Sequence, residues 1–215
     1  MGQKVHPTVF RLGVNQNWEA SWFATKRTYS QKLISDLSIR KYLETKLKSA
    51  SLESVYIKRF NNKIEVEITV ARPGVVIGRG GAGIEQIKKE LNKMVGENVD
   101  VKVYEVRKPE ISAEIIAANI VGQLENRVVP KYSAQRAIEA AKNTQLVKGV
   151  RIWVSGRIKG AEIARTEKFQ WGTVPLQTIR GDIDYALHVA NVPNAGLQGV
   201  KVWVYKGEKF AYDEK

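Results

Sequence analysis

Cysteine is absent from this chain of 215 residues, and histidine occurs only twice, at His6 and His188. A Cys/His metal site needs several of these side chains close together, and a cysteine nucleophile needs a thiol. The sequence therefore predicts neither a metal site of this kind nor cysteine catalysis. The absence of cysteine is also compatible with a reducing cytoplasm.

Long hydrophobic runs are missing as well. No apolar run approaches the roughly 18 residues that a membrane-spanning helix needs. The first ten residues, MGQKVHPTVF, lack the apolar stretch of a secretory signal. We therefore expect no membrane partner. The hydrophobic content of 43% and the charged content of 27% are typical of an ordinary soluble protein.

Acidic residues are in the minority along the whole chain. Lys and Arg number 35 against 22 Asp and Glu, which gives a net charge of +13. Residues 1–106 carry 18 basic and 11 acidic groups, and residues 107–215 carry 17 and 11. The excess is thus not confined to a basic tail. It indicates attraction to a polyanion along the whole molecule, although a solubilising surface is the alternative.

The first half has the periodicity of a helix followed by a hairpin. Residues 1–29 show no clear period and look like an extended arm. Apolar positions at helical spacing predict a helix over roughly 30–49. Alternation predicts strands over 52–60 and 64–71, joined by a tight antiparallel turn at Asn61-Asn62.

Residues 75–87 read VVIGRGGAGIEQI and contain two overlapping glycine patterns. Gly78 to Gly83 match G-x-G-x-x-G, which is typical of a dinucleotide-binding turn. Gly78 to Gly81 match the shorter G-x-x-G, which clamps an RNA backbone in KH domains. A helix ending at Gly96 and an alternating strand over 99–105 follow.

The elements around the loop favour the RNA interpretation. Arg72-Pro73-Gly74 leaves only three residues for a strand before the loop, and the preceding strands form a hairpin. A dinucleotide fold needs parallel strands joined by crossover helices. Two successive helices follow Glu105, where that fold would continue with another strand-helix repeat.

The chemistry of the loop also suits RNA. Glycines present bare backbone amides, and a helix N-terminus adds partial positive charge. In this interpretation Gly83 has no special role in the helix that follows. The loop that we expect to bind RNA comprises Gly78, Arg79, Gly80 and Gly81, with the basic residues Arg72, Lys88 and Lys89 nearby.

The second half predicts two helices and four strands. The stretch Arg107-Lys108-Pro109 is the best candidate for a linker between two domains. Ser112 can cap a helix that reaches Val128 and stops at Pro130, and a second helix covers about 132–146. Strand-like runs lie at 150–156, 161–169, 182–189 and 200–205. Asp182 and Asp184 could mimic a paired-carboxylate site, but glycosidase-type chemistry also needs a cleft and a tuned acid, and we expect no catalysis.

The order α-β-β-α-α-β with VIGRGGAGI at its centre resembles a type II KH domain. The wider chain resembles the bacterial-type small-subunit ribosomal protein three family. The segments that carry this resemblance are MGQKVHP, RLG, WFA, ARPGVVIGRGG, EVRKPE, SGRIKGAEIARTE, DIDYA and GVKVWVYKGE. It implies an α+β fold: an arm over 1–29, a KH domain over 30–106, and a second α+β domain over 107–215 with two helices packed on a four-stranded sheet.

The resemblance also implies a function without catalytic turnover or cofactor. Its expected partners are small-subunit rRNA, mRNA and the tenth and fourteenth small-subunit proteins, in the head of a cytoplasmic subunit and without homo-oligomerisation. The residues expected to contact rRNA are Lys4, Arg11, Arg157, Lys159, Arg165, Lys168 and Arg180.

In this family, a basic stretch lines the channel by which mRNA enters. The matching stretch here, residues 126–137, offers Arg127, Lys131 and Arg136. Polar or aromatic residues stand where the family usually has Arg or Lys: Asn126, Tyr132, Gln135, Gln170 and Thr173. These residues leave the strength of mRNA unwinding open, whereas we expect rRNA binding to be intact. Tyr132 and Trp171 could either stack on bases or pack.

A free KH-containing regulator of mRNA or small RNA is the alternative function. Such a protein would not need SGRIKGAEIARTE or the strands that follow it. The second domain therefore favours the ribosomal interpretation.

Overall fold

The computed structural model describes residues 4–60 and 63–209, and the expected turn at Asn61-Asn62 lies outside them. The chain divides into two compact units. Residues 18–107 form the first, which we call the glycine-loop unit. Residues up to 17 and from 108 onward form the second, the C-terminal unit. The division differs from the arm that we expected over 1–29, because contacts of residues before and after Asn17 fall in different units.

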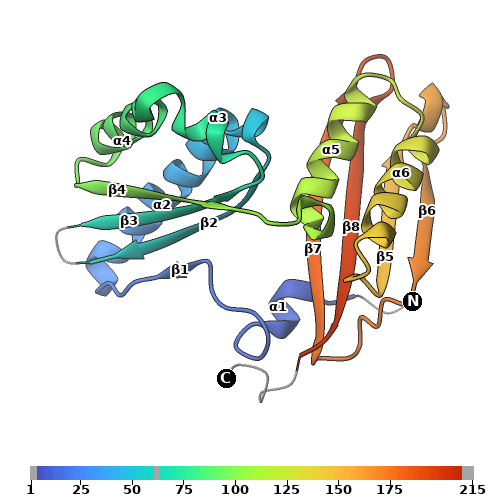
Figure 1. Ribbon diagram of the computed structural model, residues 1–215, viewed down its shortest axis with the longest axis horizontal. Helices are drawn as coiled ribbons and strands as arrows, with labels where there is room; N and C mark the ends of the chain where they lie inside the picture. The colour runs from blue at the N-terminus through green and yellow to red at the C-terminus, as the bar shows by residue number, and fades with distance from the viewer. Residues whose placement is uncertain (1–3, 61–62, 210–215) are drawn as a thin grey trace. The chain divides into compact units, whose positions relative to one another are not determined.

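The glycine-loop unit has the predicted order α-β-β-α-α-β (Figure 1). Its strands form one sheet in the order β1-β2-β3-β4, with β2 and β3 antiparallel and β4 parallel to β3. The elements are β1 (Ala20–Ser21), α2 (Lys26–Lys46), β2 (Leu52–Arg59), β3 (Ile64–Val70), α3 (Pro73–Ile77), α4 (Ala82–Val95) and β4 (Val99–Glu105). The KH-type fold is thus confirmed, with the short β1 added beside β2.

Alternation in β3 builds the core of this unit. Ile64, Val66, Ile68 and Val70 are all fully buried, whereas the glutamates between them lie on the other face. Because successive strand residues point to opposite faces, this pattern presents one apolar face to the helices. The helical residues that pack into the same core include Ile39, Leu43, Val76, Ile87 and Leu91.

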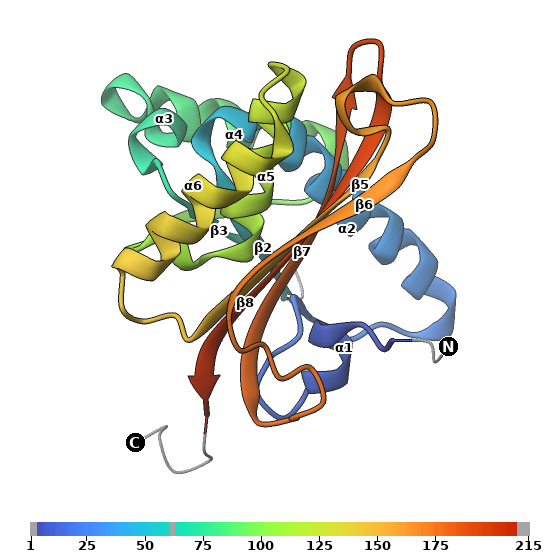
Figure 2. The same ribbon diagram turned by 90° about the vertical axis from the view of Figure 1, so that its right-hand side faces the viewer.

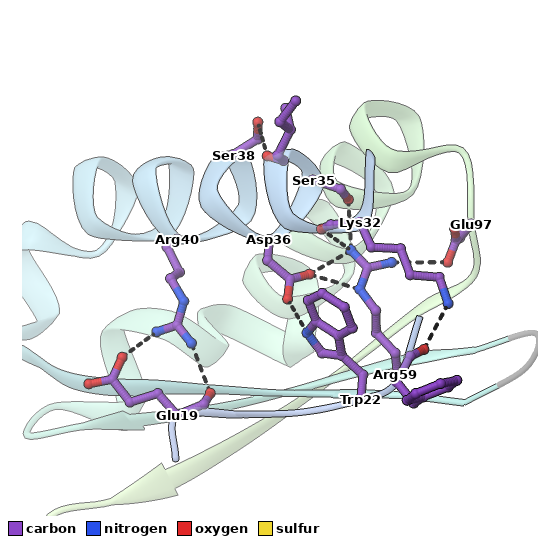
Figure 3. Close-up of polar contacts among 11 residues, drawn as sticks. Glu19, Trp22, Lys32, Ser35, Asp36, Ser38, Arg40, Arg59 and Glu97 are labelled. Carbon is purple, nitrogen blue, oxygen red and sulfur yellow. Dashed lines mark hydrogen bonds and ion pairs between the residues drawn. The ribbon is translucent and has the colours of Figure 1, made fainter. Parts of the chain in front are cut away.

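A buried charge network fixes the segment before α2 (Figure 3). The Asp36 carboxylate accepts hydrogen bonds from Trp22 Nε1 at 2.7 Å and from Arg59 Nε at 2.8 Å. The Asp36 and Arg59 side chains are only 6% and 3% exposed. Arg40 also donates to the Glu19 carbonyl at 2.8 Å. These bonds explain why residues 18–29 belong to this unit.

The C-terminal unit is the predicted α+β domain. An antiparallel sheet in the order β6-β5-β8-β7 carries α5 and α6 on one face (Figure 2). Its elements are α1 (Pro7–Arg11), α5 (Ala113–Glu125), α6 (Pro130–Asn143), β5 (Gly149–Gly156), β6 (Arg165–Gly172), β7 (Gly181–Val192) and β8 (Gly196–Glu208). In the part of the chain that the structure describes, no helix is both long and apolar enough to cross a membrane.

Several element ends differ from the sequence predictions. Pro130 is the first residue of α6 and does not end α5, since proline suits a first helical position that needs no amide donor. Helix α2 begins at Lys26, earlier than predicted, and periodicity missed its first turn because that turn is polar. Strand β6 begins at Arg165, after a turn at Ile158–Gly160.

Asp184 has a structural role at the start of α5. Its Oδ2 accepts the Ala113 amide at 2.9 Å, whereas the hydroxyl of Ser112, the cap that we predicted, has no partner in the described residues. Asp182 pairs with Lys209 at 3.2 Å. Each aspartate of the apparent carboxylate pair therefore serves the fold, one as a helix cap and one in an ion pair.

Candidate nucleic-acid interface

The loop between α3 and α4 turns on three glycines with positive φ. Gly78 has φ 68° and ψ −176°, a conformation that is essentially confined to glycine. Gly80 and Gly81 follow with φ of 63° and 83°. Without side chains at these positions, the backbone can approach a ligand closely. The glycines of the sequence pattern therefore lie at the positions where the backbone of the loop needs positive φ.

Gly83 has a role that the sequence analysis missed. A Cβ atom there would lie 2.4 Å from the Val76 carbonyl oxygen and 3.0 Å from that of Ile77. Both neighbours are backbone atoms of α3, which cannot give way as a flexible side chain would. Gly83 thus lets α3 and α4 pack against each other at the loop, and our expectation of an ordinary helical position was wrong.

The surface of the loop presents donors and charge. Gly78, Arg79 and Gly80 are exposed, and the Arg79 side chain has no partner in the described residues. No side chain caps the N-terminus of α4, although its first amide, that of Ala82, donates to the Arg79 carbonyl. Beside the loop, Val75 and Ile77 are 56% and 38% exposed. The arrangement offers amides and a cation to a phosphate and an apolar surface to a base.

The three basic residues expected near the loop differ in their surroundings. Arg72 and Lys89 are exposed. Lys88 instead lies 3.3 Å from Asp100, which also pairs with Lys63 at 2.9 Å. Lys63 and then Lys88 hold the pKa of Asp100 below its ordinary value. Lys88 therefore forms an ion pair within the protein and is less available to RNA than Arg72 and Lys89.

The residues expected to line an mRNA channel lie on the α5–α6 helix pair. Arg127 occupies the connection with φ 62°, and Lys131 and Arg136 lie on α6. All three side chains are exposed. Tyr132 is 60% exposed, so it is not packed in the core, whereas Trp171 packs against the helix-facing core of the sheet.

The residues expected to contact rRNA lie in several places on the C-terminal unit. Lys4 and Lys168 lie 5.1 and 4.8 Å from the ring centroid of Trp153. Arg157 and Lys159 lie at the turn before β6, where both are exposed.

Two more of these arginines have acidic partners. Arg165 is 3.1 Å from Glu167, and Arg180 is 3.0 Å from Glu208. Their side chains remain 57% and 59% exposed. An exposed ion pair contributes little to stability, so these arginines can exchange their partners for phosphate.

Arg11 requires a correction, because it is 0% exposed. Its Nε donates to the Gly181 carbonyl at 2.7 Å, and its Nη2 donates to those of Leu176 and Thr178 at 3.1 and 2.8 Å. Burial lowers the pKa of the guanidinium. Arg11 joins the N-terminal segment to the loop before β7, and RNA cannot reach it.

No site for a metal emerges from residues 4–60 and 63–209, where no group of three or more His, Asp or Glu side chains is placed to hold an ion. The functional candidates in this part of the chain are therefore cations, amides and aromatic rings. These groups suit a polyanion with stacked bases.

Two family models match the chain. The model for the KH domain matches residues 38–111, and the model for "Ribosomal protein S3, C-terminal domain" matches residues 120–204. Together they cover the glycine loop and nearly all of the sheet of the C-terminal unit.

Full-length relatives give the same result. The small ribosomal subunit protein uS3 of Desulforamulus reducens is 47% identical over 208 residues, which are 97% of this chain and 93% of the relative. The uS3 protein of Enterococcus faecalis is 45% identical over 97% of this chain and 94% of its own length. That of Persephonella marina is 46% identical over 98% and 92%. The chain belongs to the small ribosomal subunit protein uS3 family and carries its KH domain.

Proposed function

We propose that this uS3-family chain is a structural constituent of the small ribosomal subunit that binds rRNA with both of its units. The carrying observation is the loop at Gly78–Gly81, which combines positive-φ glycines, a helix start without a side-chain cap and the exposed Arg79. Phosphate binding at such a helix start needs no base-specific contact. The net charge of +13 supports the same polyanionic partner.

The loop binds rRNA backbone in this proposal, with Arg72 and Lys89 adding charge and Lys88 contributing less because of Asp100. On the C-terminal unit, the residues that contact rRNA phosphates are Lys4, Arg157, Lys159, Arg165, Lys168 and Arg180. Such contacts position the protein on its RNA and do not read sequence.

The α5–α6 helix pair lines the channel by which mRNA enters. Arg127, Lys131 and Arg136 supply its charge, and the exposed Tyr132 can stack on an unpaired base. This channel surface is less basic than an Arg- and Lys-rich one, so it guides mRNA more than it unwinds it. Lys131→Ala should slow translation through a messenger hairpin while subunit assembly proceeds. An equal loss of both would make Lys131 an rRNA anchor.

The wider setting follows the family resemblance. In this proposal the protein lies in the head of a cytoplasmic small subunit, as a single copy, next to the tenth and fourteenth small-subunit proteins. The alternative, a free KH regulator, is disfavoured because the similarity to uS3 proteins extends through the C-terminal unit.

Sedimentation of a cell lysate separates the two functions. The ribosomal proposal predicts that the chain co-sediments with small subunits and remains with them in moderate salt. Protein that stays at the top of the gradient and is absent from small-subunit fractions would contradict it and favour the free regulator.

A further inference from the structure

A small pocket in the C-terminal unit lies where three separate segments meet. They are the α5–α6 connection, the turn before β6 and the β7–β8 turn, which share one end of the sheet (Figures 1 and 2). Its volume is about 240 Å³. The residues that matter for its chemistry are Arg127, Val128, Lys159, Pro193, Asn194 and Gln198.

The charged residues that line this pocket are all basic. Arg127 and Lys159 both line it, both are exposed, and neither has an ion-pair partner within the described ranges. None of the described residues that line the pocket is acidic. Two cations from segments far apart in sequence therefore converge without a counter-charge, which is the arrangement expected for a phosphate ligand.

The backbone at the pocket is strained. Arg127, Lys159 and Asn194 have φ of 62°, 57° and 68°. They are three of the five non-glycine residues with positive φ in the described part of the chain. Such conformations cost free energy and cluster at functional sites.

A buried side chain at this pocket is only partly hydrogen-bonded. Gln198 is 3% exposed and donates its Nε2 to the Arg157 carbonyl at 3.1 Å. Its Oε1 is buried and accepts no hydrogen bond from any described residue. A buried acceptor without a donor is costly. This cost falls at the wall of the pocket, which Gln198 lines.

The size of the pocket limits the ligand. Small-molecule sites usually have about 300–1,000 Å³, so this one has room for a single base beside a phosphate. We propose that it binds one nucleotide of single-stranded RNA, with Arg127 and Lys159 on its phosphate and the base against Val128 and Pro193. This inference rests on the proposed RNA-binding function. It joins Arg127, expected on mRNA, and Lys159, expected on rRNA, in a single site.

A double-mutant cycle on the full chain tests this. The variants are Arg127→Asn, Lys159→Asn and both together, because asparagine tolerates positive φ. Their affinity for a labelled, unstructured 12-nucleotide RNA with all four bases is measured over a range of salt. We expect each single variant to lose about 5- to 10-fold, and the double variant to lose less than the product of the two single losses, because both cations bind one phosphate. The salt slope should fall by about 0.7 in the double variant, which neutralises one phosphate fewer.

The control combines Arg127→Asn with Lys142→Asn, which is exposed on α6 and lies outside the pocket. Its two effects should multiply. If the Arg127 and Lys159 effects also multiply, with a slope change near 1.4 for two phosphates, the single-nucleotide site is overturned while RNA binding stands. Unchanged affinity in all three pocket variants, with loss in a loop variant at Arg79 and Gly80, would also overturn it. Loss in none of these variants would contradict the proposed function itself.

Photocrosslinking then identifies the source of the nucleotide. Small subunits are assembled with 4-thiouridine either in a messenger oligonucleotide or in the rRNA. A crosslink to the peptide around Val128 in one arm supports the site and assigns it to that RNA. A crosslink in neither arm, with the pocket covered by a neighbouring protein, would overturn the proposal.

Discussion

The surfaces that we propose bind RNA differ in chemistry between the two units of this chain. At Gly78–Gly81 the glycine-loop unit offers backbone groups to the RNA. In our proposal this works because the glycines have no side chains that would keep the RNA backbone away. Around Arg127, Lys131 and Lys159 the C-terminal unit offers side-chain cations. A substitution in the first surface is therefore expected to change geometry, whereas one in the second changes charge. In our proposal, a single basic protein thus binds RNA in both ways.

The units also differ in how they hold a buried arginine. Arg59 of the glycine-loop unit bonds to a carboxylate, that of Asp36, at 2.5 Å. Arg11 of the C-terminal unit bonds only to main-chain carbonyls. Arg59 belongs to an ion-pair network, and Arg11 holds chain segments in place.

Arg11→Met should have the largest effect on stability. The change keeps the aliphatic bulk but leaves the carbonyls of Gly181, Leu176 and Thr178 without their donors. We expect a loss of about 3 kcal/mol or more in the free energy of unfolding of the C-terminal unit, measured by urea denaturation. Arg136→Met, at an exposed position, should change it by about 0.5 kcal/mol or less.

The RNA salt slope separates this role from the expected one. It should be unchanged in Arg11→Met under conditions where the variant is folded, because RNA cannot reach the buried side chain. A lower slope with unaltered stability would show that Arg11 contacts RNA after all.

Gly83→Ala should have the next largest effect, in the other unit. The added methyl group meets the Val76 carbonyl at 2.4 Å, which forces α3 and α4 apart. We expect about 1–3 kcal/mol of destabilisation of the glycine-loop unit, together with weaker RNA binding.

Gly74→Ala is the matched control, because a Cβ at Gly74 in α3 would meet no atom within 4 Å. It should leave both quantities nearly unchanged. Equal behaviour of the two variants would mean that the helices do not depend on close packing at Gly83.

Acid should produce a smaller, graded loss of stability in the glycine-loop unit. Hydrogen bonds from Lys102, Tyr42 and Lys63 lower the pKa values of Glu65, Glu90 and Asp100, respectively. A carboxyl group with a lowered folded-state pKa stabilises the fold above its unfolded value and loses that contribution as pH falls through the folded one.

The ordinary pKa values are 4.5 for the glutamates and 3.8 for Asp100, so the loss should begin near pH 4.5 and continue below it. Hydrogen exchange of the β3 amides measures this loss of stability as the pH is lowered. Replacing these three carboxyl groups by amides should flatten the pH dependence, and an unchanged profile would contradict the assignment.

Much of the glycine-loop unit could be predicted because its signals are local. Alternation gave β2, β3 and β4, and Gly96 with φ 75° ends α4 as its sequence position suggested. The start of α2 and the strand β1 were not predictable from periodicity. A polar first turn has no apolar period, and two residues are too few to alternate.

Features that depend on distant residues could not be predicted. The cap of α5 comes from Asp184, which is 71 positions from Ala113. Arg11 looked like an exposed cation, and its burial depends on carbonyls more than 160 positions away. The convergence of Arg127 and Lys159 on one pocket likewise appears only in the folded chain. In contrast, the glycine loop could be predicted because its conformation depends on residues that are consecutive in the sequence.

The comparison between the units rests on the claim that the glycine loop binds RNA, and the double variant Arg79→Asp with Gly80→Asp tests it most directly. A Cβ at Gly80 meets no atom within 4 Å, and aspartate tolerates positive φ, so the fold should survive. Arg79→Asn with Gly80→Asn is the neutral control of the same shape. We predict that the acidic pair weakens binding to small-subunit rRNA about 10-fold or more and flattens its salt dependence, with a smaller loss in the neutral pair. Unchanged affinity in the folded acidic variant would contradict the RNA-binding role of the loop.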